Sequence, residues 1–132
     1  MPLRISLKAG ERLIVGGAVV KNGKSRCDLL IENDVPILRG REVLSLDEAD
    51  SPCRRIVFAI QLMYVDPGHA AEHQALYDQL VRDVVQASPS MTPLITEIGE
   101  RIAAGQFYPA LKVGRMLIAY EEELISHVAV RS

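Results

Sequence analysis

The sequence predicts an α+β fold, in which a small N-terminal antiparallel β-meander of about five strands precedes a C-terminal half of four helices. Two observations support this. Before residue 40, short segments alternate polar and apolar residues between glycine-containing turns. After residue 44, apolar residues recur at helical spacing. The 132 residues are the length of one ordinary domain, and we expect a single domain, 1–132, with a β-rich layer at 1–44 and a helical layer at 45–132.

Five short strands account for the first layer. Leu3–Leu7 alternates in period two, which indicates one buried face and one wet face. Gly16-Gly17 supplies the positive φ angles of a two-residue hairpin loop, and Asn22-Gly23 predicts a second hairpin. Pro36 favours an edge position for the last strand. The expected strands are 3–7, 12–15, 18–21, 26–32 and 35–39.

The segment 51–67 predicts the central helix. Ser51 is a good N-cap and Pro52 suits the first helical position, where a missing N–H has no cost. From residue 56 to residue 65 only Gln61 is fully polar, so we expect β-structure and helices to enclose this helix. Ten apolar residues reach about 15 Å, roughly half of a bilayer core, so a membrane span is disfavoured.

Three further helices follow. One covers residues 69–87, with Leu76, Leu80 and Val84 at four-residue spacing. The next covers 91–104, and Gly105 ends it. Upstream of the central helix, Ser45 and Glu48 have the pattern of a capping box. The last begins at Pro109. Its apolar stripe consists of Val113, Leu117, Tyr120 and Leu124, and their spacing is that of a coiled-coil seam. This helix could equally well pack against a partner, against a second copy of the chain or in the core of a monomer.

Composition narrows the class of protein. The net charge is −2, but residues 1–44 carry +3 and residues 45–132 carry −5, so a polyanion would meet the first part more readily and a basic partner the second. Ordinary solubility charge is the alternative explanation. The N-terminus lacks the apolar stretch of a signal peptide, and the two cysteines have no metal-motif spacing. We expect a cytoplasmic protein without a cofactor.

Several motifs resemble catalytic or metal sites without completing one. His69 and His73 have the i, i+4 spacing that metals use, near Asp66 and Glu72, yet no third ligand is evident, so a surface helix start is the simpler interpretation. Cys53 lies at a helix start, where the dipole can lower a thiol pKa. The run 121–123 reads as a solvated acidic face, and Gly16-Gly17 lacks the lysine of a phosphate loop. We therefore expect no enzyme and no metal site.

The basic residues of the first layer form the more informative set. They fall on short strands and turns, where guanidinium and ammonium groups can hold RNA phosphates. No aromatic residue precedes Phe58, so base stacking on the sheet is disfavoured, and protection of sheet edges is the competing use. The candidate RNA-binding residues are Arg4, Lys8, Arg12, Lys21, Lys24, Arg26, Arg39 and Arg41.

Several blocks in order carry a family resemblance. They are LKAGER at 7–12, GGAVVKNG at 16–23, LLIENDVPILR at 29–39 and EADSPCRRIVFAIQLMYVDP at 48–67. Together they resemble the FlbT family of flagellar regulators. The resemblance implies a cytoplasmic post-transcriptional regulator that binds the 5′ untranslated leader of flagellin mRNA, lowers its translation and stability, and works with a second regulator, FlaF. Gly40 departs from the family pattern, where a charged residue is expected.

The strand order is also similar to that of the carbon storage regulator family of RNA-binding translational repressors. That likeness implies a site in which Arg4 and Lys8 on the first strand and Arg39 and Arg41 after the last strand line the RNA. In this arrangement Lys21, Lys24 and Arg26 form a clamp at a hairpin tip.

Two hypotheses follow. In the first, the β layer of a non-enzymatic repressor binds the flagellin leader and the acidic helices bind protein partners. In the second, the chain is a protein-binding adaptor that captures flagellin or a FlaF-type regulator on its apolar helices, with an indirect effect on RNA. The apolar excess of the helices also leads us to expect a homodimer or a larger assembly.

Overall fold

The structure, a computed structural model, describes residues 3–131, with side chains described up to residue 127. The chain divides into two compact units, Met1–Leu44 and Ser45–Ser132. The first, called the β unit below, contains the strands, and the second, the helical unit, contains the four long helices. The α+β class predicted from the sequence is confirmed. That the two units act as one domain stays a prediction.

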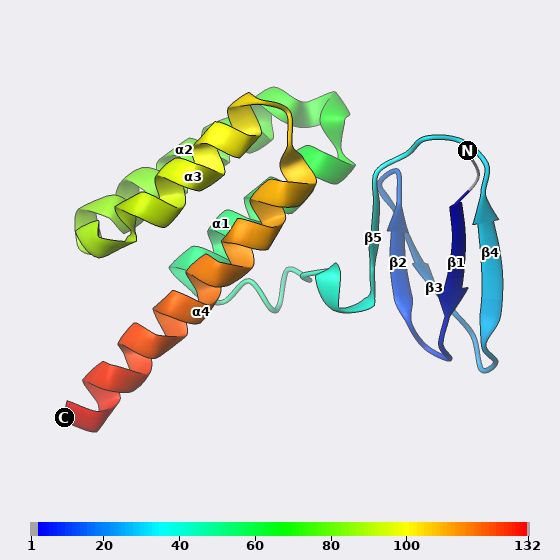
Figure 1. Cartoon of the computed structure of the whole chain (residues 1–132), viewed down its shortest axis with the longest axis horizontal. Coiled ribbons are helices and arrows are strands. Elements are labelled where there is room, and N and C mark those ends of the chain that lie inside the picture. The colour runs from blue at the N-terminus through cyan, green and yellow to red at the C-terminus, as the bar shows by residue number, and fades with distance from the viewer. Residues whose placement is uncertain (1–2, 132) are drawn as a thin grey trace. The chain divides into compact units, whose positions relative to one another are not determined.

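The β unit contains five short strands in two antiparallel sheets (Figure 1). Strands β1 and β4 form one sheet, and the other has the order β3-β2-β5. Among the described residues, β2 and β3 form the only hairpin of consecutive strands, so the predicted antiparallel strands are present but do not pair in the order of a simple meander. The strands are β1 (Leu3–Leu7), β2 (Arg12–Val15), β3 (Ala18–Lys21), β4 (Cys27–Ile31) and β5 (Ile37–Arg39).

The two predicted hairpins have different outcomes. Gly16 and Gly17 have φ angles of +55° and +94°, and the loop places Val15 opposite Ala18, as a two-residue hairpin requires. The hairpin predicted at Asn22-Gly23 is wrong, because β3 and β4 belong to different sheets. The Asn22 side-chain amide instead donates to the Lys8 carbonyl at 2.8 Å, which ties this turn to the one after β1. The Gly23 amide donates to the Asn22 side-chain oxygen at 2.8 Å. The Asn-Gly pair therefore forms a local turn, but this turn does not join two paired strands.

Period-two alternation sets the core of the β unit. Ile5 and Leu7 are buried on the inner side of β1, whereas Arg4 is exposed on the outer side. Leu13 of β2 packs with Ile5 and Leu7. Cys27 borders the same cluster, and its thiol donates to the Asn22 side-chain oxygen at 3.3 Å. These contacts give Cys27 a structural role in the β unit.

The helical unit holds four helices in an antiparallel arrangement (Figure 1). Helix α1 packs against α2 and α4, and α3 packs against α4. Short 3₁₀ turns begin at Pro67 and at Pro89, directly before α2 and α3. The capping box at Ser45 and Glu48 is present, and it closes a short turn before α1, as expected. The helices are α1 (Pro52–Val65), α2 (Ala70–Ala87), α3 (Thr92–Ala103) and α4 (Phe107–Arg131).

Helix α1 is the core of the helical unit, as its sequence predicts. The Ser51 hydroxyl accepts from the Arg54 amide at 3.2 Å, and Pro52 occupies the first turn. Ile56 and Ile60 are fully buried, and Gln61 is buried as well. Enclosure of α1 by helices is confirmed by its contacts with α2 and α4. Enclosure by the β layer stays a prediction.

Glycine allows α1 and α4 to approach closely. Gly114 of α4 is buried, and a Cβ at this position would lie 2.8 Å from a methyl group of Val57. The other inward positions on α4 include Leu117 and Val113, which the seam-like spacing identified. On α2 the pattern was partly wrong, because Leu76 is 44% exposed while its neighbour Tyr77 is buried.

Candidate nucleic-acid interface

Basic side chains gather around a cleft of about 710 Å³ within the β unit. The cleft lies where the turn after β1, the segment before β4 and the end of β5 come together, so its walls come from separate parts of the chain. Five of the eight candidate residues line it: Lys8, Arg12, Arg26, Arg39 and Arg41.

The turn between β1 and β2 forms one wall. The Lys8 amide donates to Glu11 Oε1 at 2.9 Å, and the Glu11 amide donates back to the Lys8 carbonyl at 3.1 Å. Gly10, with φ of +73°, lets the chain reverse, and its amide donates to the Gly23 carbonyl at 3.0 Å. The side chain of Lys8 stays exposed at the rim.

The end of β5 forms the opposite wall. Arg39 Nη2 donates to the Ser6 carbonyl at 2.6 Å and lies 3.7 Å from Glu11 Oε2, so this guanidinium joins β5 to β1. Gly40 then turns the chain with φ of +48°, and a Cβ there would lie 2.7 Å from Glu11 Oε2. This explains why glycine stands where the family resemblance suggests a charged residue. A side chain would meet both an unfavourable backbone conformation and the Glu11 carboxylate.

Positive charge dominates the cleft, since Glu11 is the one acidic residue that lines it among the residues described. The Glu11 side chain is only 18% exposed and is held by the Lys8 amide. Lys8, Arg26 and Arg41 are exposed, and within the described part of the chain their side chains make no hydrogen bond or close ion pair. An open cleft of this kind suits an anion with several negative groups, such as a phosphodiester chain.

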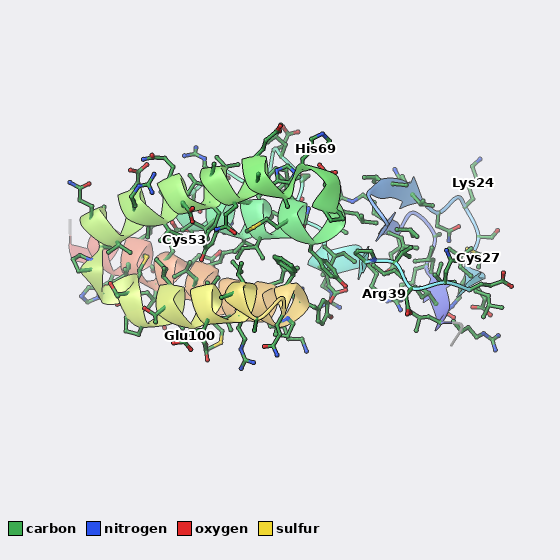
Figure 2. The ribbon with its side chains drawn as sticks, turned by 90° about the horizontal axis from the view of Figure 1, so that it is seen from above. Lys24, Cys27, Arg39, Cys53, His69 and Glu100 are labelled. Atoms are coloured by element: carbon green, nitrogen blue, oxygen red, sulfur yellow. The ribbon has the colours of Figure 1, made fainter. Side chains whose placement is uncertain are left out.

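Three candidate residues lie outside the cleft lining. Arg4 projects from the outer face of β1 and forms an ion pair with Asp28 at 2.9 Å. Hydrogen bonds from Ser6 and Arg4 lower the pKa of Asp28 below its ordinary value. Lys21 ends β3, and Lys24 lies in the turn before β4, apart from Arg39 (Figure 2). The clamp of Lys21, Lys24 and Arg26 is therefore split, with only Arg26 at the cleft.

Sequence reasoning missed the residues that shape the cleft without carrying positive charge. Glu11 is acidic and so falls outside the candidate set of basic residues, although it contacts both walls of the cleft. Ser6 contributes its backbone carbonyl, for which no side-chain pattern exists. The one available indication was the pair of glycines, Gly10 and Gly40, each next to a cationic segment.

A second polar cluster lies at the turn between α1 and α2. Asp66 Oδ2 lies 3.1 Å from His69 Nδ1 and 2.9 Å from His73 Nε2. Hydrogen bonds from His73 and His69 lower the pKa of Asp66, and the Asp66 carboxylate raises the pKa of His69. Figure 2 shows His69 at the surface of the helical unit. Across the described residues, no group of three or more His, Cys, Asp or Glu side chains has a metal-binding arrangement.

The sequence leaves open a lowered thiol pKa at Cys53 and favours a solvated face for residues 121–123, and the structure supports neither. Cys53 is fully buried (Figure 2), and burial together with the Glu121 carboxylate raises its pKa to about 12 instead of lowering it. The run 121–123 is not simply a solvated face. Glu121 is only 5% exposed and accepts from the Ser51 hydroxyl at 2.5 Å and from the Cys53 amide at 3.0 Å, while Glu122 forms an ion pair with Arg54.

Comparison with known proteins gives a consistent result. A model of the family described as flagellar protein FlbT matches residues 3–125. The probable flagellum biosynthesis repressor protein FlbT 1 of Bradyrhizobium diazoefficiens is 46% identical over 125 residues, covering 94% of this chain and 85% of the relative. The flagellum biosynthesis repressor protein FlbT of Caulobacter vibrioides is 33% identical over 131 residues, covering 98% and 93%.

Two further findings bear on the class of protein. No solved structure matches this chain. Among the described residues, no helix combines the length and the apolar character that crossing a membrane requires. The match of the family model along most of the chain, together with relatives of this identity and coverage, shows that the chain belongs to the FlbT family of flagellar proteins.

Proposed function

We propose that this protein is a non-enzymatic repressor of flagellum biosynthesis that binds the 5′ untranslated leader of flagellin mRNA through the cleft of the β unit. Its relatives are named flagellum biosynthesis repressors, which supports the regulatory role. The observation that carries the RNA-binding part is the gathering of five cationic side chains, from separate segments, around one open cleft. Binding there lowers translation and stability of the transcript.

The chemistry of the cleft favours contacts to the RNA backbone. Lys8, Arg26 and Arg41 offer charges for phosphates, and arginine guanidinium groups can also stack on unpaired bases. The β unit has no aromatic residue, so stacking on aromatic rings makes no contribution. We therefore expect affinity to depend strongly on salt and preference among single-stranded sequences to be modest.

Binding of purified full-length protein to a labelled flagellin leader RNA tests the proposal. In the cleft variant, Lys8→Ala with Arg41→Ala, two exposed cations are removed, and we expect affinity to fall by about 10-fold or more. The control variant, Lys21→Ala with Lys24→Ala, removes the same charge from the same unit outside the cleft lining. It should fall by less than about 3-fold.

The outcomes separate the alternatives. Equal losses in both variants would mean that RNA follows net charge and does not occupy the cleft. A larger loss in the control variant would mean that the RNA contacts Lys21 and Lys24, outside the cleft lining. If the purified protein leaves the leader unbound at low salt, direct recognition is wrong, and an adaptor that acts through flagellin or a FlaF-type regulator becomes the better account.

A further inference from the structure

The inward face of α4 continues past the part of the bundle that covers it. Glu121 of α4 is level with the start of α1, because it bonds to Ser51 and Cys53. Ile125 lies one helical turn further along the same face, yet it is 58% exposed. Ten residues of α4 follow Glu121, a length of about 15 Å, and Figure 1 shows this end running beyond the start of α1. We call residues 122–131 the tail of α4.

An apolar cleft of about 490 Å³ opens beside the tail, within the helical unit. Its floor is the start of α1 with Cys53, one wall is the end of α2 with Leu80 and Ala87, and the other wall is the tail with Leu124 and Ile125. Figure 1 shows α2 and α4 diverging toward this end. The tail and the cleft therefore expose apolar side chains that no helix of the same chain covers among the residues described.

We propose that a second copy of this chain completes this layer, each copy placing the tail of its α4 in the cleft of the other. The arrangement is a two-fold exchange in which identical surfaces meet. It does not depend on RNA binding and concerns the helical unit alone.

Area and symmetry favour a second copy over a separate helix. A stable interface buries about 800 Å² on each partner, which is more than a single helix of three turns supplies. In a reciprocal exchange every copy contributes both a tail and a cleft, so the buried area is doubled. The tail already forms one apolar wall of its own cleft, so its surface is apolar enough to pack in the equivalent cleft of the facing copy.

Charge contributes one complementary pair, although the acidic residues Asp83 and Glu121 also line the cleft. Arg55 lies at the rim of the cleft, and Glu123 flanks Leu124 on the tail. In the described part of the chain, neither side chain has a close ion-pair partner. A two-fold exchange lets Arg55 of each copy approach the acidic tail of the other, twice in one dimer.

Sedimentation of the full-length protein over a wide concentration range tests the exchange. The parent should show a monomer–dimer equilibrium. Ile125→Glu places a charge in the interface twice and should raise the dissociation constant by about 100-fold or more. Met116→Glu is the matched control, since Met116 is 56% exposed on the outer face of the same helix, and it should leave the constant within about 3-fold.

Two further variants test the partner surface and the charges. Ala87→Glu on the α2 wall should weaken the dimer as Ile125→Glu does. Arg55→Glu or Glu123→Arg alone should weaken it by about 3-fold to 10-fold, and the two together should restore it. All these positions are exposed, so the variants should fold, and far-UV circular dichroism checks this.

A parent protein that stays monomeric throughout overturns the proposal, whether or not its cleft binds another helix. A dimer that survives Ile125→Glu, or that Met116→Glu disrupts equally, overturns it as well.

Discussion

Glu121 joins α4 to the start of α1, and its removal is the sharpest test of how the helical unit is held together. The carboxylate is buried and accepts from the Ser51 hydroxyl and the Cys53 amide. It also places negative charge at a helix N-terminus, where the dipole favours it. In Glu121→Ala both donors lose their acceptor inside the protein.

The expected loss follows from these contacts. A hydrogen bond to a charged group contributes about 1.5–3 kcal/mol, and two are lost. Part of this is offset because a buried carboxylate no longer has to be desolvated. We therefore expect Glu121→Ala to lower the free energy of unfolding by about 2–4 kcal/mol. Glu121→Gln keeps one acceptor oxygen and should lose about half as much.

Urea unfolding followed by far-UV circular dichroism measures the effect. Glu100→Ala is the control, because Glu100 is an exposed helix glutamate outside the cleft beside the tail of α4, and its effect should stay within about 0.5 kcal/mol. If Glu121→Ala is no more destabilising than Glu100→Ala, the carboxylate does not cap α1 and the reasoning fails.

Three other predictions concern the helical unit. Gly114→Ala should lower its stability by about 1–3 kcal/mol in urea unfolding, because the added Cβ meets Val57 at 2.8 Å; a loss no greater than that of Gly99→Ala, where no atom lies within 4 Å, would contradict this. The pKa of His69, followed by NMR, should lie above its ordinary value and return toward it in Asp66→Asn. A raised pKa means that the contact between His69 and Asp66 stabilises the native state fully below about pH 6.5, and that this stabilisation is lost as pH rises through the raised pKa. The difference in urea midpoint between the parent and Asp66→Asn should therefore shrink over that range, and a difference that grows would contradict the prediction. In native protein at neutral pH, Cys53 should react with a thiol reagent far more slowly than the partly exposed Cys27, because its thiol is buried and its pKa is about 12; equal rates would refute its burial.

Features that depend on neighbouring residues could be predicted from the sequence. The start of α1 follows from Ser51 and Pro52, and the β2–β3 hairpin follows from Gly16-Gly17. The bounds of the strands and helices agree with expectation to within a few residues for the same reason. Local dihedral preferences and side-chain periodicity determine such features.

Features that depend on tertiary contacts could not. The pairing of β1 with β4 joins residues that lie 20 to 28 positions apart in the sequence. Asn22 has the sequence pattern of a hairpin turn, but its side chain instead contacts the turn after β1. Glu121 looked like one of three solvated acids because nothing nearby in sequence indicates that α4 passes the start of α1.

The candidate site lies between these cases. The basic residues could be identified from the sequence, but their division into a cleft group and three others depends on where the turns bring Lys8, Arg26 and Arg41. Arg39 is an example: its guanidinium donates to the Ser6 carbonyl and lies close to the Glu11 carboxylate, so it has a structural role that the sequence does not indicate.

The salt dependence of leader RNA binding tests the central claim most directly. For a single strand, each phosphate contact contributes about 0.7 to the slope of log affinity against log salt concentration. Removing Lys8 and Arg41 together should therefore reduce the magnitude of the slope by about 1.4, while removing Lys21 and Lys24 leaves it unchanged. An unchanged slope in the Lys8/Arg41 variant would show that the cleft does not hold the RNA backbone.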